Sequence, residues 1–475
     1  MTSSFYWHDY ETFGIDPQRD RASQFAGIRT DAEFNIIDKP LVLYCRLPED
    51  CLPSPEACLI TGITPQRVAH GLNEAEFIAR IHQEMSQPQT CCVGYNSIRF
   101  DDEVTRNLLY RNFYDPYARE WQHQNSRWDL IDVVRACHAL RPDGIIWPQS
   151  DEGVVSLKLE ALSKANNILH EQAHDALSDV YATIAMAKLI KQLQPKLLEY
   201  TLNLRNKQFV QALLTIGQYK PLVHISGRYP NKSNNLAIVL PVCVHPLNDK
   251  EICVYDLSIS PAEFIDRSVD ELRDCLFSSY ENSQQESVRL PVKTIHINKC
   301  PVVAPLNVMR NEDWLRLKLD PDSHQKHIEI IKNNPEFSRK IQQIFSKRHE
   351  STTSDPELMI YSGGFFSSRD KQTMNQLRTL SPDMLSSVNP TFSDDRLSEL
   401  WFRYKARNWP DTLTDHEKNA WRSFCKERLH QGQPSTWQCF VESIQKMQSM
   451  GNQDDLILKD LLEYAQSCRP EKYQS

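Results

Sequence analysis

The chain has 475 residues, of which 40% are hydrophobic and 24% are charged, and its formal net charge is −8 at pH 7. This length predicts roughly two to four domains with sizeable cores. The negative charge argues against a protein that coats nucleic acid by electrostatics alone, but it is compatible with a local basic track because salt screens distant charges.

Targeting and redox features predict a cytoplasmic protein. The N-terminus lacks a basic region followed by an apolar run, so we expect no secretory signal. No stretch approaches the length of a membrane span, so we expect no membrane partner. The thirteen cysteines are scattered without a Cys-x-x-Cys pair, which indicates reduced and mostly buried thiols. We also expect the protein to be a monomer.

The first part of the chain, residues 1–194, predicts an α/β domain that mixes strands and helices. The helix at 74–85, for example, is indicated by apolar residues at helical spacing, such as Phe77, Ile81 and Met85. The expected strands cover 5–12, 24–30, 34–46 and 91–95, and the first three are expected to be antiparallel. The expected helices cover 74–85, 102–111, 126–140, 156–167 and 174–193.

Beyond residue 194 the pattern changes to a β-rich domain and then to helices. Short strands separated by turn residues are typical of a small barrel or sandwich. These strands are expected at 222–225, 237–240, 252–255 and 292–297, with helices at 196–214 and 312–347. A polar linker at 351–356 precedes a wholly helical tail. The predicted domains therefore cover 1–194, 195–350 and 351–475.

Two carboxylates on the first predicted strand are candidate metal ligands. Asp9 and Glu11 are two residues apart, so they point to the same face of the strand. They interrupt an otherwise aromatic strand, where burying an unpaired carboxylate is costly. The spacing alone is weak, because most such pairs are solvated surface. It also occurs at Asp31/Glu33, Asp101/Glu103, Asp355/Glu357 and Asp415/Glu417.

Further acidic positions lie where a metal site needs them. Asp101 follows a predicted strand at the point where a helix begins, a setting typical of catalytic residues. Asp179 lies in the first turns of the predicted helix at 174–193, and His174 precedes it by five residues. Two other pairs share the His-x4-Asp spacing, namely His138/Asp143, which runs into a Pro-Asp-Gly loop, and His170/Asp175, which is out of register with the helix.

The order of these residues resembles the DEDDh group of 3′→5′ exonucleases, which have a ribonuclease H-like fold. The related tyrosine-bearing group would need Tyr at position 175, which is Asp. Longer strings look like the bacterial exodeoxyribonuclease I family, and the likeness covers nearly the whole chain. These strings lie at 8–14, 59–65, 94–96, 99–106, 110–117, 296–301 and 403–408.

The resemblance implies a processive enzyme that degrades single-stranded DNA from its 3′ end to 5′-mononucleotides, with a role in DNA repair and recombination. It implies a mixed-sheet exonuclease domain, an SH3-like middle domain and a helical C-terminal domain. It also implies a partner, the acidic C-terminal tail of single-stranded DNA-binding protein. The residues we expect to receive such a tail are Arg141, Tyr200 and Lys220.

The chemistry of these residues fits phosphodiester hydrolysis with two Mg²⁺ ions, or Mn²⁺ in their place. We expect Asp9 to bridge both ions, with Glu11, Asp101 and Asp179 completing the oxygen ligands. Histidine titrates near neutral pH, so His174 is the expected general base.

Residues 99–128 interleave arginines with aromatic side chains, the pattern of a sequence-independent grip on single strands. Alternatively, half or more of these aromatics are core, and some arginines pair with neighbouring acids. The expected substrate contacts are Arg106, Tyr117, Trp121, Arg135 and Lys158.

Two other functions remain open from the sequence. One is a related exonuclease that acts on short RNA, which the long middle and tail regions disfavour. The other is a catalytically inactive nucleic-acid-binding module. The complete set of four carboxylates and one histidine argues against it, because a binding module has no use for them.

Overall fold

The computed structural model describes residues 4–169, 174–277, 289–347, 353–450 and 455–469. The chain divides into two compact units. The first unit comprises Met1–Ser126, His170–Ile184 and Ser351–Ser475, so the two ends of the chain fold together. The second unit comprises Arg127–Leu169 and Ala185–Glu350.

The N-terminal sheet is mixed, and β1 is its central strand. The strand order is β3-β2-β1-β4-β5. β1 pairs with β2 antiparallel and with β4 parallel, and β2 pairs with β3 antiparallel, as expected. The strands are β1 (Ser4–Thr12), β2 (Ala22–Thr30), β3 (Leu41–Tyr44), β4 (Thr90–Gly94) and β5 (Ser126–Asp129).

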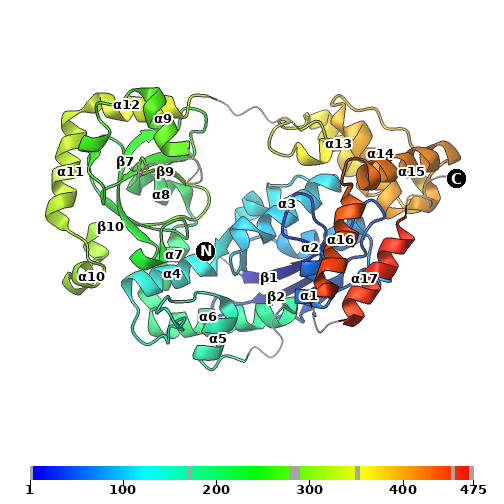
Figure 1. Ribbon diagram of the computed structural model, residues 1–475, viewed down its shortest axis with the longest axis horizontal. Coiled ribbons are helices and arrows are strands. Elements are labelled where there is room, and N and C mark those ends of the chain that lie inside the picture. The colour runs from blue at the N-terminus through cyan, green and yellow to red at the C-terminus, as the bar shows by residue number, and fades with distance from the viewer. Residues whose placement is uncertain (1–3, 170–173, 278–288, 348–352, 451–454, 470–475) are drawn as a thin grey trace. The chain divides into compact units, whose positions relative to one another are not determined.

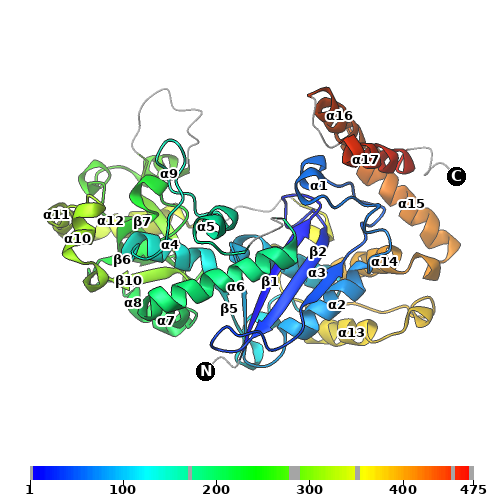
Figure 2. The ribbon, with the colours of Figure 1, turned by 90° about the horizontal axis from the view of Figure 1, so that it is seen from below.

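The alternation of side chains along β1 separates its core face from the face that carries acids. Tyr6 and Tyr10 pack with Phe25 and Phe77 in one buried cluster. This face is covered by α2 (Glu74–Met85) and α3 (Asp101–Arg111), which lie beside β1 and β2 in Figure 2. Asp9 and Glu11 are offset by one residue from these tyrosines and therefore point to the opposite face.

Two predicted elements in this region were wrong. The strand expected at 34–46 is only Leu41–Tyr44, because most of the polar stretch before it is exposed. The helix expected at 126–140 begins as strand β5. Helix α4 (Leu130–Leu140) starts only after Asp129, whose side chain accepts a hydrogen bond from the Ile131 N–H and caps the helix.

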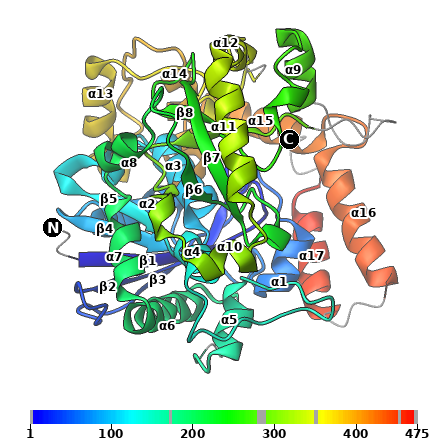
Figure 3. The ribbon, with the colours of Figure 1, turned by 90° about the vertical axis from the view of Figure 1, so that its left-hand side faces the viewer.

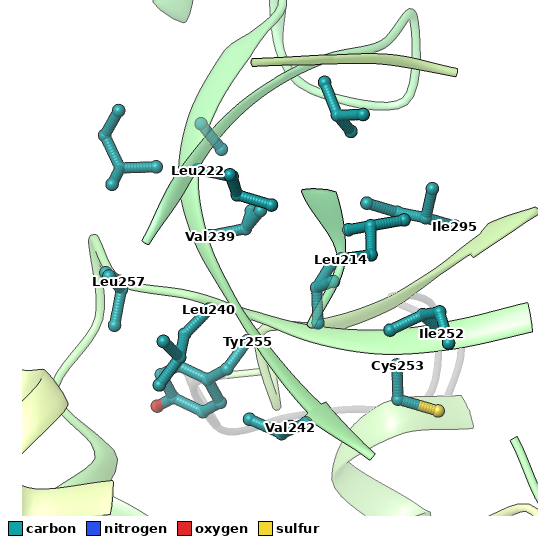
Figure 4. Close-up of a cluster of buried hydrophobic side chains, with 14 of the residues drawn as sticks. Leu214, Leu222, Val239, Leu240, Val242, Ile252, Cys253, Tyr255, Leu257 and Ile295 are labelled. Atoms are coloured by element: carbon teal, nitrogen blue, oxygen red, sulfur yellow. The ribbon is translucent and has the colours of Figure 1, made fainter. Parts of the chain in front are cut away.

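The second unit contains an antiparallel five-stranded sheet in the order β10-β6-β7-β8-β9. Its core includes Leu222, Val239 and Tyr255, which Figure 4 shows among neighbouring aliphatic side chains. The strands are β6 (Leu222–Ile225), β7 (Leu236–Val244), β8 (Glu251–Asp256), β9 (Val292–His296) and β10 (Val302–Pro305). The sequence analysis missed β10, which has only four residues, follows Pro301 and ends at Pro305.

Helices cover this sheet. α12 packs against β7 (Figure 3), and α4 packs against β6. The helices expected at 196–214 and 312–347 are interrupted, since Asn206 caps a new helix and Pro321 and Pro335 each begin one. The helices of this unit, besides α4, are α5 (Leu159–Ala165), α7 (Pro195–Asn203), α8 (Lys207–Leu213), α9 (Val269–Phe277), α10 (Asn311–Arg316), α11 (Pro321–Asn333) and α12 (Pro335–Ile344).

The C-terminal segment of the first unit is helical, as expected. α14 contacts α2, and α16 and α17 lie side by side against α1 (Figure 1). The helices are α1 (Pro55–Thr61), α13 (Ser368–Arg378), α14 (Arg396–Asn408), α15 (Asp415–His430), α16 (Thr436–Ser449) and α17 (Asp455–Ser467). One further helix, α6 (Ala176–Leu193), runs from the first unit into the second.

Two further expectations concern the membrane and the cysteines. Within the described residues, no helix is both long and apolar enough to span a bilayer. All thirteen cysteines lie in the described part of the chain, and each is a free thiol. Most of them are buried, as the scattered pattern predicted.

Candidate active site

Three carboxylates converge where β1 meets the start of α6. Asp9 and Glu11 come from β1, and Asp179 lies in the first turn of α6. Each offers one oxygen, and the three oxygens lie within 4.8 Å of one another. Glu11 is buried, whereas Asp9 and Asp179 are half-buried. Hard carboxylate oxygens at this spacing are a suitable donor set for a divalent cation.

Asp101 is held beside this group by backbone geometry. It is the first residue of α3, and its Oδ1 accepts a hydrogen bond from the Tyr10 N–H at 3.1 Å. The Thr105 hydroxyl, one turn further along α3, donates to the Asp101 carbonyl oxygen at 2.8 Å and is 3.0 Å from the Tyr10 hydroxyl. The start of α3 is therefore joined to the middle of β1.

The carboxylates perturb one another strongly. Burial, followed by the charges of Asp179 and Asp101, raises the pKa of Glu11 to about 9. Burial also raises the pKa of Asp9, and the negative charges of Asp101, Glu11, Asp179 and Asp175 raise it further. The charges around both groups are thus mainly negative, and a bound cation would remove this repulsion.

The candidate base lies just before α6. His174 is exposed and adopts a left-handed backbone conformation with φ of 65°. The next residue, Asp175, accepts a hydrogen bond from the Gln24 Nε2 of β2 at 2.9 Å, which attaches this loop to the sheet. This loop leads directly into the first turn of α6, which carries Asp179.

The alternative histidine pairs have different settings. His138 is buried on α4, its ring centroid lies 4.8 Å from that of Trp147, and burial lowers its pKa to about 4. It is therefore a core residue of the second unit. His170 lies outside the described residues.

Comparisons with known proteins agree along the whole chain. Family models described as Exonuclease, Exonuclease I SH3-like domain and Exonuclease I C-terminal domain match residues 6–187, 205–347 and 354–468, respectively. Exodeoxyribonuclease I of Escherichia coli K12 is 45% identical over 98% of each chain. This chain belongs to the exodeoxyribonuclease I family. The predicted fold class and enzyme class are therefore confirmed.

Solved structures of the family extend the comparison. E. coli exonuclease I in complex with a dA16 oligonucleotide matches with a TM-score of 0.95 and 44% identity, covering 98% of this chain and 100% of that one. A zinc-bound form of the E. coli enzyme with single-stranded DNA matches with a TM-score of 0.94 and 43% identity, at the same coverage. Metal dependence belongs to this exonuclease family, and the carboxylate group described above fits it.

The expected substrate contacts of the first unit lie near α3. Trp121 is 65% exposed, so it is not a core residue. Arg106 is buried, and its guanidinium binds both Glu120 oxygens, at 2.7 and 2.9 Å, and also Glu103. Its guanidinium carbon lies 5.4 Å from the ring centroid of Tyr117. Arg106 thus orients an aromatic ring, and its nitrogens are already engaged.

Other aromatics of this stretch are core, as the alternative interpretation predicted. Tyr110, Phe113 and Trp128 are all buried. Phe113 contacts Trp401 and Tyr404 of α14, with ring centroids 5.8 and 5.3 Å apart. Helical spacing alone does not separate these rings from Tyr117 and Trp121.

Two aromatic residues that the sequence analysis missed lie beside Tyr117. Tyr361 is 52% exposed and its hydroxyl binds Glu103, while Arg106 Nη1 donates to it at 3.2 Å. Phe365 is 86% exposed, and its ring centroid lies 6.2 Å from that of Tyr117. No local pattern joins them to this site, because they lie far away in the sequence.

The remaining expected contacts belong to the second unit. Arg135 on α4 pairs with Asp132 at 2.6 Å and lies against the backbone of Gly227, where an added Cβ would come within 2.7 Å of its Nη2. Lys158 is exposed just before α5.

The expected partner-binding residues are also in the second unit, in different environments. Arg141 ends α4, donates from Nη2 to the Val308 carbonyl oxygen at 2.9 Å and lies 3.5 Å from Asp313. The Tyr200 hydroxyl donates to the Val303 carbonyl oxygen at 2.8 Å. Lys220 is exposed.

Proposed function

We propose that this member of the family degrades single-stranded DNA processively in the 3′→5′ direction to 5′-mononucleotides, with a role in DNA repair and recombination. The observation that carries the proposal is the convergence of Asp9, Glu11 and Asp179 within 4.8 Å, with Asp101 anchored beside them. This arrangement provides a site of high negative charge on a rigid strand, which suits cation-dependent phosphodiester hydrolysis.

We propose Mg²⁺ as the native metal, at two ions per site, with Mn²⁺ able to replace it. When bound, such ions neutralise phosphate charge and make water a better nucleophile. Asp9, Glu11 and Asp179 would hold the metal through their carboxylate oxygens. Asp101 acts in the same group and also fixes α3 against β1.

His174 is the proposed general base, because it is exposed on the loop that leads into Asp179. Its imidazole accepts the proton of the attacking water at neutral pH. The loop connection through Asp175 and Gln24 keeps this histidine near the sheet.

The proposed strand contacts are Tyr117 and Trp121 for base stacking, with Arg135 and Lys158 as cations. Arg106 belongs to this contact as the residue that orients the Tyr117 ring. We further propose that the acidic tail of single-stranded DNA-binding protein binds near Arg141, Tyr200 and Lys220. A monomeric state, a cytoplasmic location and domain boundaries at residues 194 and 350 remain predictions of the sequence.

The proposal is tested by Asp9→Asn and Asp179→Ala. Both variants should lose the release of mononucleotides by roughly 10³-fold or more, because metal binding and charge neutralisation are lost together. Binding of single-stranded DNA should stay near the wild-type level. Glu33→Gln, a change in another Asp-x-Glu pair, is the matched control and should keep full activity. Near wild-type turnover in either site variant would refute the site assignment.

The RNA alternative needs a separate comparison. The rates of cleavage of matched DNA and RNA single strands should differ strongly in favour of DNA. Equal rates, or faster cleavage of RNA, would favour the alternative substrate. Complete absence of cleavage with Mg²⁺ and with Mn²⁺ would favour a binding module.

A further inference from the structure

The two aromatic rings proposed to stack on bases lie in an irregular segment, residues 113–124. The segment forms two short 3₁₀ turns. Its backbone is strained at both ends, since Phe113 has φ of 65°, and His123 and Gln124 have φ of 53° and 63°. Residues with a side chain adopt such conformations only where the surrounding structure enforces them. The segment therefore depends on tertiary contacts for its shape.

A fully buried ion pair joins this segment to α3. Arg119 lies between Tyr117 and Trp121 in the sequence, and its Nη2 lies 2.7 Å from Oδ1 of Asp102. The two side chains of this pair are 0% and 1% exposed. Burial opposes the charge of Arg119, but the charge of Asp102 raises its pKa above the ordinary value. The pair therefore stays ionised inside the protein.

A second ion pair, of opposite polarity, lies one helical turn further along α3. Glu120, the neighbour of Arg119, binds the Arg106 guanidinium through both carboxylate oxygens, at 2.7 and 2.9 Å. Asp102 and Arg106 are four residues apart, so they lie on the same face of the helix. An acid and a base on α3 thus meet a base and an acid on the segment. A shift of the segment by one residue would bring like charges together, so the two pairs select one register.

The setting of Arg119 indicates a role other than stability. Its Nε and Nη1 are buried without a hydrogen-bond partner among the described residues. A buried ion pair with incomplete hydrogen bonding adds little to the stability of a fold, because lost hydration offsets the attraction. Asp102 directly follows Asp101, whose Oδ1 accepts a hydrogen bond from the Tyr10 N–H of β1. The pair thus connects the aromatic segment to the strand that carries the carboxylates.

We propose that Arg119 is a positioning residue for the substrate strand. Through Asp102 it holds the Tyr117 and Trp121 rings in one place relative to the carboxylates, so that a strand stacked on the rings reaches the site in register. The inference rests on the proposed function, since it requires these two rings to contact the strand. Arg119 itself is buried, so its effect on DNA passes through other residues.

The test is Arg119→Lys, which keeps the charge but loses the planar fork of the guanidinium. Affinity for a fluorescent oligothymidylate is measured by anisotropy in EDTA, so that no cleavage occurs. It should fall roughly tenfold, because stacking on both rings is weakened. With Mg²⁺ present, the KM should rise by a similar factor while kcat stays near the wild-type value, since the interaction that is lost binds ground state and transition state alike.

A double-mutant cycle separates positioning from a purely structural role. In the Tyr117→Ala/Trp121→Ala background, Arg119→Lys should change the affinity by less than about twofold, because the rings that it positions are gone. Arg111→Lys is the matched control, since Arg111 is also buried and its Nη2 lies 3.1 Å from the Glu74 carboxylate. This control should lower the Tm comparably but leave the affinity for DNA unchanged.

Three results would overturn the proposal. They are wild-type affinity in Arg119→Lys, wild-type affinity in Tyr117→Ala/Trp121→Ala, and an equal effect of Arg119→Lys with and without the two rings. If Arg119→Lys fails to fold, the isosteric change Asp102→Asn breaks the same pair and should show the same dependence on the rings. Failure of the proposed function is a different observation, because the wild type would then release no mononucleotides with Mg²⁺.

Discussion

The raised pKa of Glu11 has a consequence for stability without metal. In the unfolded chain a glutamate titrates near pH 4.3, whereas in the fold Glu11 titrates at about 9. The folded state therefore binds the extra proton between these values, so stability falls as pH rises through this window. We expect the Tm in EDTA to decrease from pH 5 to pH 9, and Mg²⁺ to raise it most at high pH.

Glu11→Gln is the control for this pH dependence. The variant lacks the titrating carboxylate, so its Tm in EDTA should vary less with pH than that of the wild type. The same pH profile in both proteins would mean that Glu11 is not the group responsible.

Trp121 and Trp128 form a matched pair of tests for DNA contact. Trp121 is 65% exposed, whereas Trp128 is 2% exposed. Trp121→Ala should weaken single-strand binding by about 1–3 kcal/mol, the usual value of one stacked base, and leave the Tm unchanged. Trp128→Ala should instead destabilise the fold by about 3–5 kcal/mol. Unchanged DNA binding by Trp121→Ala would remove this residue from the substrate path.

At the scale of elements, a buried ion cluster connects α14 and the 3₁₀ helix Pro356–Leu358 to the N-terminal region. Arg407 binds Asp50, with Nη2 and Oδ2 2.7 Å apart, and also binds Glu357. Arg21 and Arg428 each lie 3.3 Å from the Glu357 carboxylate. Such a cluster is stable only when every charge has its partner.

Glu357→Gln should therefore lower the free energy of unfolding by about 3–5 kcal/mol, because Arg407 and Arg21 lose a buried counter-charge. Arginine charges hold the pKa of Glu357 well below its usual range, even though burial opposes them. The stability that the ionised Glu357 carboxylate gives to the fold is therefore present above about pH 4.3. It is lost as the pH falls below that value. Denaturant unfolding at pH 7 and pH 3 measures the difference in free energy of unfolding between the wild type and Glu357→Gln. The same difference at both pH values would contradict this prediction.

At the scale of the whole molecule, the two ends of the chain build one compact unit. Phe113 and Tyr110 share a buried cluster with Met374, Leu377 and Leu397 of the C-terminal helices. A chain that ends at residue 350 exposes these rings and leaves Asp50 without Arg407. We expect this truncated protein to unfold at a lower temperature or aggregate, and to recover when residues 351–475 are supplied as a separate chain. A wild-type Tm for the truncated protein would contradict this.

Much of the site followed from local sequence. The period-two pattern of β1 determined that Asp9 and Glu11 share a face opposite Tyr10, because strand geometry alternates side chains. The placements of Asp101 and Asp179 at helix starts also followed from local patterns. The family resemblance then chose these residues from several equivalent Asp-x-Glu and His-x4-Asp pairs.

Other features were decided only by tertiary structure, because they depend on contacts between residues far apart in the chain. The engagement of Arg106 by Glu120 and Tyr361, and the exposure of Phe365 beside Tyr117, carry no local pattern. Strand β10 is too short to be recognised without its partner β6. By itself, the sequence predicted which carboxylates converge, since strand and helix periodicity limits the candidates and the family resemblance chooses among them. Which arginines and aromatic rings remain available to a substrate depends on long-range packing, and only the fold decided that.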